Sequence, residues 1–117
     1  MHNSILRDKS FNFALRIIKL SKYLQTTHKE YILSKQILRS GTSIGALIRE
    51  AQYAQSKADF LHKLTIALKE ANETEYWLLL LSQSDYIDEG MSNSIFPDIK
   101  ELLKLLVSST KTVKAYK

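Results

Sequence analysis

The sequence predicts an all-α fold: an up-down-up-down antiparallel four-helix bundle, built as a single domain over residues 1–117. Three observations predict it. The chain of 117 residues is 44% hydrophobic, enough for one core of ordinary domain size. It has only three Gly and one Pro, too few for a fold rich in turns. Apolar residues recur at steps of three and four in four successive segments, as they do along the inner faces of helices.

The first helix is expected over residues 10–25. Its inner face is marked by Ala14, Ile17, Ser21 and Leu24, and is widened by Phe11, Phe13, Ile18 and Leu20. This spacing is typical of an amphipathic helix that buries one side.

The second helix is expected over residues 28–54. The stretch Thr27–Glu30, "THKE", has the form of a capping box, in which threonine and glutamate satisfy free backbone donors, so a helix start near His28 is predicted. Its inner stripe alternates steps of four and three, the pattern of helices packed at shallow angles. The stripe consists of Leu33, Ile37, Ser40, Ile44, Leu47 and Ala51.

The third helix is expected over residues 57–83. A second capping pattern, "SKAD" at Ser56–Asp59, precedes it. Its stripe consists of Phe60, Leu64, Ala67, Ala71, Thr74, Leu78 and Leu81. The run "YWLLLL" near its end is apolar on nearly all sides, which indicates extra burial at a subunit interface. We expect that interface to include Tyr76, Trp77 and Leu80.

The fourth helix is expected over residues 93–114, after a connection rich in polar residues and Gly. Ile99, Leu103, Leu106, Thr110 and Val113 would face inward. Proline fits a helix best in its first turn, so Pro97 predicts a start between Ser92 and Phe96.

Two glycines lie inside the second helix, in "ILRSGTSIGALIREA", and each costs roughly 1 kcal/mol relative to alanine. Gly41 and Gly45 are one turn apart beside Ser40, so they would form a flat strip that another backbone could approach closely. The alternatives are a local kink or a glycine that faces solvent.

The middle of the chain, Leu38–Ile87, resembles the four-helix bundle family of proteins encoded in intervening sequences of bacterial large-subunit ribosomal RNA genes. Where many members have "SIPANIAEG", this chain has Gly45, Leu47 and Ala51. The residues that carry the resemblance are Arg39, Ser43, Ile44, Ile48, Glu50, Ser56, Asp59, Phe60, Glu73 and Glu75.

The resemblance implies a homo-oligomer, specifically a five-fold ring. Related proteins include the accessory protein of diversity-generating retroelements, which partners a reverse transcriptase and binds nucleic acid. A reverse transcriptase, another protein, RNA and DNA are therefore the partners that the resemblance implies.

No residue pattern in the chain indicates catalysis, a cofactor or a metal. His2, His28 and His62 lack the spacing of metal ligands. Glu70, Glu73 and Glu75 are expected to form a solvated face or to pair with bases. No Gly-rich phosphate loop or nucleophile elbow is present. The sequence therefore predicts a protein that is not an enzyme.

Two further groups of residues have both structural and binding interpretations. Arg39 is expected to pair with Glu73 or Glu75 across the second and third helices, which favours a role in register over substrate binding. Tyr53, Tyr76 and Trp77 fit core or interface positions better than base stacking.

The charge distribution is the main functional signal. The chain carries a net charge of +5, residues 1–49 hold nine Lys and Arg against two acids, and no acid follows Glu101. We expect nucleic acid, most simply RNA, to bind a basic face formed by Arg7, Lys9, Arg16, Lys19, Lys22, Lys111, Lys114 and Lys117. The alternatives are an oligomeric adaptor that binds a protein through the third helix, and a basic surface that serves solubility only.

The cellular compartment is predicted from composition and from the lengths of the apolar runs. The chain has no Cys, its N-terminal residues lack the apolar region of a signal peptide, and no run approaches the length of a membrane span. We expect a cytoplasmic protein without a membrane partner.

Overall fold

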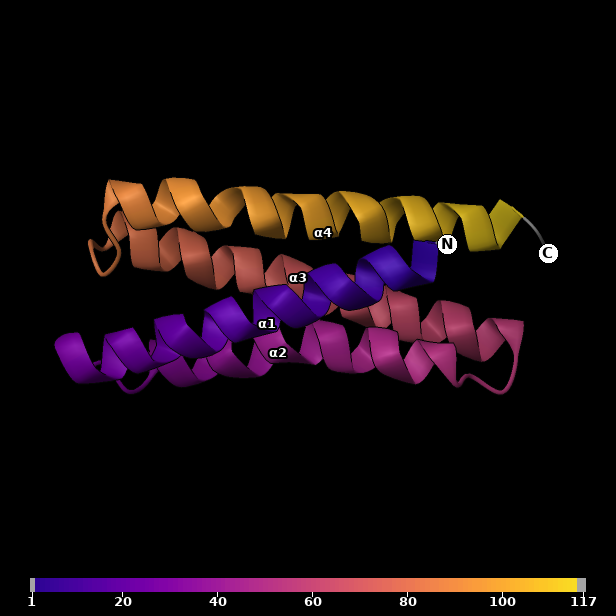
Figure 1. Cartoon of the computed structure of the whole chain (residues 1–117), viewed down its shortest axis with the longest axis horizontal. Coiled ribbons are helices and arrows are strands. Elements are labelled where there is room, and N and C mark those ends of the chain that lie inside the picture. The colour runs from indigo at the N-terminus through magenta and orange to yellow at the C-terminus, as the bar shows by residue number, and fades with distance from the viewer. Residues whose placement is uncertain (1, 116–117) are drawn as a thin grey trace.

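The computed structural model describes residues 2–115, which form four helices: α1 (His2–Thr27), α2 (Leu33–Gln52), α3 (Lys57–Gln83) and α4 (Glu89–Ala115). Consecutive helices run in opposite directions, which confirms the predicted up-down-up-down bundle (Figure 1). The start of α1, the end of α4 and the α2–α3 connection lie at one end of the bundle, and the other two connections lie at the opposite end (Figure 1).

The core follows the predicted faces of α2, α3 and α4 closely. In α3 every predicted inner residue is buried except Phe60, which is half-buried. In α2, Gly41 and Ile48 join the core, while Leu33 and Leu47 are half-buried. In α4 the predicted Ile99, Leu106 and Thr110 are buried, whereas Leu103 and Val113 are only half-buried. Ile95 and Leu102 join the core instead.

The predicted face of α1 was too wide. The buried residues of this helix are Leu6, Ser10, Phe13, Ile17, Leu20, Ser21 and Leu24. Phe11 and Ile18, predicted to face inward, are 58% and 36% exposed. Each lies roughly 100–120° around the helix from Ile17, which points to the centre, so neither can reach the core. The helix is also longer than the predicted 10–25.

The predicted start of α2 near His28 is wrong, because Thr27 ends α1 and does not cap α2. Glu30 alone caps α2. Its carboxylate accepts three backbone N–H groups, from Ile32 at 3.2 Å, Leu33 at 3.0 Å and Ser34 at 2.8 Å. Partial burial acts to raise the pKa of Glu30, but these three donors outweigh it, so the pKa lies below its ordinary value of 4.5.

The predicted cap of α3 is confirmed. The Ser56 hydroxyl accepts the N–H of Asp59 at 3.0 Å, and the Asp59 carboxylate accepts the N–H of Gln55 at 3.2 Å. These reciprocal bonds explain why α3 begins at Lys57, as the sequence predicts.

The predicted start of α4 is wrong by about one turn. Asp88 caps the helix, with its carboxylate accepting the N–H of Met91 at 2.8 Å, so α4 begins at Glu89. Pro97 therefore lies inside the helix rather than in its first turn. Pro97 cannot donate to the carbonyl of Asn93, but Asn93 is exposed and water can supply the missing donor.

The glycine strip of α2 faces α1, which confirms that small residues permit a close approach of helices. A Cβ at Gly41 would lie 2.8 Å from Ile17, and a Cβ at Gly45 would lie 3.4 Å from the backbone oxygen of Ser10. The first distance is prohibitively short and the second is ordinary contact, so Gly41 is the position that requires glycine.

Across residues 2–115, no helix combines the length and the apolar character needed to span a bilayer.

Candidate nucleic-acid interface

Arg39 joins α2 to α3 as expected. Its Nη2 lies 3.1 Å from Oε2 of Glu73 and 3.5 Å from Oε1 of Glu70. The indole N–H of Trp77 donates to the same Glu73 oxygen at 3.1 Å. The other candidate partner, Glu75, pairs instead with Lys100 of α4 at 3.4 Å.

Further contacts of the resemblance residues and their neighbours stabilise α2 and its packing on α3. The hydroxyls of Ser40 and Thr74 share a buried hydrogen bond of 3.0 Å between the helices. Glu50 pairs with Lys63 at 2.9 Å, and this hydrogen bond and charge raise the pKa of Lys63. Ser43 donates to the carbonyl of Arg39, Ile44 and Ile48 are buried in the core, and Phe60 packs against it. The contacts assign this motif a structural role.

The predicted interface residues of α3 differ in exposure. Tyr76 is 55% exposed, whereas Trp77 and Leu80 are half-buried, Trp77 against the core and bonded to Glu73. Leu79, which the sequence analysis did not single out, is 47% exposed. The exposed apolar surface here is therefore formed by Tyr76 and Leu79, and its role as an interface stays a prediction.

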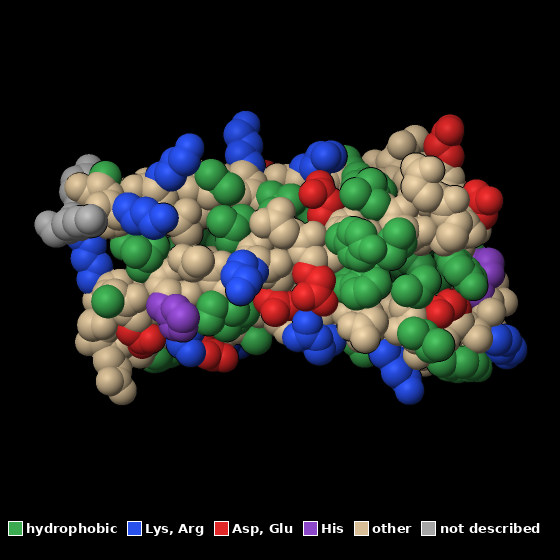
Figure 2. Space-filling model, turned by 180° about the vertical axis from the view of Figure 1, so that it is seen from behind, with side chains coloured by type: hydrophobic (Ala, Val, Ile, Leu, Met, Phe, Trp, Pro, Cys, Tyr) green, Lys and Arg blue, Asp and Glu red, His purple; other side chains and the backbone are tan. Residues whose placement is uncertain are grey.

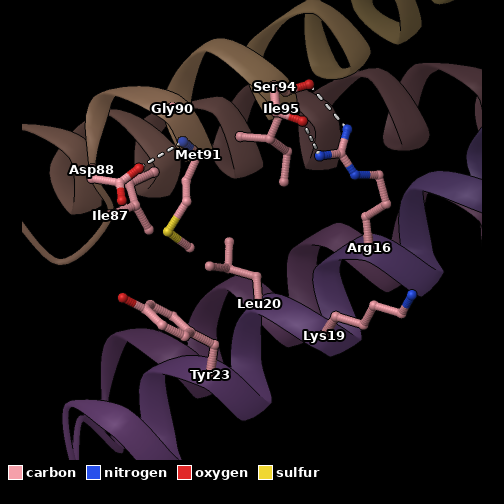
Figure 3. A pocket seen from close by; sticks show the side chains of 10 residues that line it. All are labelled: Arg16, Lys19, Leu20, Tyr23, Ile87, Asp88, Gly90, Met91, Ser94 and Ile95. Atoms are coloured by element: carbon pink, nitrogen blue, oxygen red, sulfur yellow. Dashed lines mark hydrogen bonds between the residues drawn. The ribbon is translucent and has the colours of Figure 1, made fainter.

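A cleft of about 620 Å³ lies between α1 and α4. Figure 3 shows its apolar wall, with Leu20 and Tyr23 on α1 opposite Met91 and Ile95 on α4. At one end of the cleft Arg16 reaches across to α4. Its guanidinium donates to the Ser94 carbonyl at 3.0 Å and to the Ser94 hydroxyl at 2.6 Å (Figure 3). It also donates to the Asp98 carboxylate at 2.5 Å.

These contacts mean that three of the predicted nucleic-acid residues already have anionic partners. Besides Arg16, Arg7 lies 3.3 Å from Asp8 and Lys9 lies 3.1 Å from Glu101. The sequence analysis grouped Lys9 with the lysines near the end of the chain, but the antiparallel register places it opposite an acid. Within the described chain Lys19, Lys22, Lys111 and Lys114 form no ion pair, and Lys117 lies outside the described residues.

The four unpaired lysines form two separate groups. Lys19 lines the cleft with Ser94, level with the first part of α4. Lys111 follows Ser94 by 17 residues on the same helix, which corresponds to roughly 25 Å at 1.5 Å per residue. The predicted basic face is thus divided along the length of the bundle. Figure 2 shows how charge is distributed along α4, with Lys and Arg gathered toward its end and acids near its start.

The group at the end of α4 is larger than the sequence analysis predicted. Arg49 ends α2 and Lys57 begins α3, so both lie at the end of the bundle where α4 finishes (Figure 1). We define the basic end as the exposed residues Arg49, Lys57, Lys111 and Lys114. The lack of acids after Glu101 was the available signal for its lysines on α4, but no sequence signal places Arg49 and Lys57 beside them.

The acids nearest to the basic end have other partners. Asp8 pairs with Arg7, Glu50 pairs with Lys63, and Asp59 accepts the N–H of Gln55. Among the ion pairs of the described residues, none involves a member of the basic end. Residues 2–115 hold no group of three or more His, Asp and Glu side chains placed to bind a metal.

Comparison with known proteins agrees with the fold and the motif. The family model described as 23S rRNA-intervening sequence protein matches residues 2–108. The crystal structure of a protein with unknown function from the S23 ribosomal protein family of Bacteroides thetaiotaomicron VPI-5482 is 58% identical, with a TM-score of 0.92. The match covers 95% of this chain and 99% of that one. No curated protein matches the chain. The chain belongs to the 23S rRNA-intervening sequence protein family.

Proposed function

We propose that this chain is a non-enzymatic, self-associating accessory protein that binds RNA or other nucleic acid through its basic end. The observation that carries the proposal is the set of four exposed cations at that end, which form no ion pair within residues 2–115. Cations without protein partners remain available to phosphates, and the counterions they release favour binding.

Self-association would strengthen this attraction. The resemblance to ring-forming proteins implies five copies, and each copy carries a net charge of +5. Several basic ends on one assembly could engage one polyanion together, so that each further contact is intramolecular.

A salt series tests the proposal. The purified chain is titrated with a structured RNA and with a duplex DNA at several salt concentrations, and its mass in solution is measured in parallel. We expect an oligomer whose affinity falls steeply with salt and that still prefers one nucleic acid at physiological salt. A monomer, or weak binding that is equal for every polyanion, would contradict the proposal.

The second candidate function is an adaptor that binds a protein, such as a reverse transcriptase, through α3. The exposed Tyr76 and Leu79 favour it, because apolar side chains at 55% and 47% exposure suit a protein contact. The double change Tyr76→Ser and Leu79→Ser distinguishes the two functions. It should leave RNA binding by each protomer unchanged under our proposal, and should abolish partner binding under the alternative.

A further inference from the structure

A groove between α1 and α2 combines an exposed aromatic ring with two guanidinium groups. Two adjoining hollows, of about 290 and 380 Å³, are both lined by Arg7, Phe11 and Arg49. The floor of the first is made of small residues, including Ala14 and Gly45. The small floor leaves one side of the groove free of bulky side chains, so a flat group can approach the ring.

Phe11 is the aromatic residue among four large apolar side chains that α1 leaves exposed, the others being Ile5, Leu15 and Ile18. It is 58% exposed, on the outer side of a helix whose core contacts come from Phe13 and Ile17. A planar apolar ring that remains in water is a stacking surface, and every nucleobase has a π-face that can occupy one. Stacking on Phe11 would cover the ring without any rearrangement of the bundle.

Two arginines are placed to hold the phosphate of such a nucleotide. Arg7 lies one turn before Phe11 on α1, and Arg49 lines the same hollow from α2. The Arg49 side chain makes no ion pair with the described residues. Arg7 donates only its Nε there, to Asp8 at 3.3 Å, which leaves its two terminal nitrogens free. Asp8 also lines the hollow and opposes the anion, so the arginines exceed the acid by one charge.

Asn12 completes the lining of the second hollow, the one of about 380 Å³. Its amide can both donate and accept, so it can bond to the edge of a stacked base. Together the groove offers a ring for a base, a guanidinium pair for a phosphate and an amide for the base edge.

From this arrangement we propose that the α1–α2 groove binds an unpaired nucleotide of single-stranded RNA or DNA, with its base on Phe11 and its phosphate between Arg7 and Arg49. Bases within a duplex are already stacked on their neighbours, so Phe11 can reach only unpaired ones. The inference rests on the proposed nucleic-acid function and deepens it, because it defines single strands as the ligand. It also adds a stacking contact with Phe11 to the basic end, with which the groove shares Arg49.

The test uses the full-length chain and fluorescently labelled oligouridine. The second probe is a fully paired duplex of equal length, which has no unpaired bases. Phe11→Leu keeps the apolar bulk but removes the ring, and should weaken oligouridine binding by about fivefold or more while leaving duplex binding unchanged. Phe11→Trp keeps a ring and should retain binding. Arg49→Gln should also weaken binding, whereas the control Lys35→Gln, an equal charge loss elsewhere on α2, should have a smaller effect.

The outcomes separate this inference from the proposed function. If the wild-type chain binds oligouridine and Phe11→Leu binds it equally well, the groove is not the site, although the basic end can still be. If Phe11→Leu changes the mass of the assembly, Phe11 is a contact between copies and the inference is overturned. If the wild-type chain binds no nucleic acid, both the inference and the proposed function are overturned.

Discussion

A Cβ atom at position 41 would lie 2.8 Å from both Cγ1 and Cγ2 of Ile17, so Gly41 and Ile17 fit together only because residue 41 has no side chain. Ile17 is completely buried and has neighbours on every side. The contact sets how closely α1 approaches α2, and thereby positions both walls of the α1–α2 groove.

Gly41→Ala should destabilise the chain by about 1–2 kcal/mol, because the strain of overpacking exceeds the gain in helix propensity. Gly45→Ala is the matched control. Its Cβ would meet Ser10 at an ordinary 3.4 Å, so it should be neutral or stabilise by up to about 1 kcal/mol. Urea unfolding of the two variants checks the difference in sign, and equal effects would contradict the assigned packing.

Thr74→Val should destabilise the chain by about 1–3 kcal/mol, because it leaves the Ser40 hydroxyl buried without its partner. The double variant Ser40→Ala and Thr74→Val removes both groups and should be more stable than Thr74→Val alone. Thermal unfolding of the wild type, the two single variants and the double variant tests this order. An additive loss in the double variant would show that the two hydroxyls are not coupled.

The pair of Arg39 and Glu73 should contribute little to stability. The Arg39 side chain is 57% exposed, so a double-mutant cycle with Arg39→Gln and Glu73→Gln should give a coupling of less than about 1 kcal/mol. Glu73→Gln should also shift the fluorescence of Trp77, whose indole N–H donates to Glu73. A larger coupling would mean that Arg39 determines stability as well as register.

Glu30→Gln should destabilise the chain in a way that depends on pH. The pKa of Glu30 is lowered in the folded state, so the carboxylate stabilises the fold above the ordinary value of 4.5, and this contribution is lost as the pH falls through the folded pKa. The variant should be less stable by about 0.5–2 kcal/mol at neutral pH, as for other lost helix caps. In stronger acid the two proteins should unfold alike. A difference that is constant with pH would contradict the capping role.

The helices and most of their inner faces could be predicted because apolar spacing reports directly on burial. Ser56 and Asp59 were also predictable, since a capping box is a local interaction. The predicted starts of α2 and α4 were wrong, because the "THKE" pattern and Pro97 do not mark them. Glu30 and Asp88, each in the preceding connection, cap these helices by themselves.

Contacts between α1 and α4 could not be predicted in the same way. The register of these helices depends on three intervening connections, so nothing local to Lys9 indicates that it meets Glu101 rather than the basic end. The same reason explains why Arg49 was missed: only the folded bundle places it near Phe11 and the end of α4.

The measurement that tests the central claim most directly compares two double charge reversals in RNA binding across a salt series. Lys111→Glu with Lys114→Glu alters the basic end. Lys19→Glu with Lys22→Glu makes an equal charge change on α1, toward the opposite end of the bundle. We expect the first pair to weaken binding at least tenfold and to lower the salt slope by roughly 2, while the second has a clearly smaller effect and both retain the wild-type mass. Equal losses from both pairs, or a loss confined to Lys19 and Lys22, would contradict the assignment of binding to the basic end.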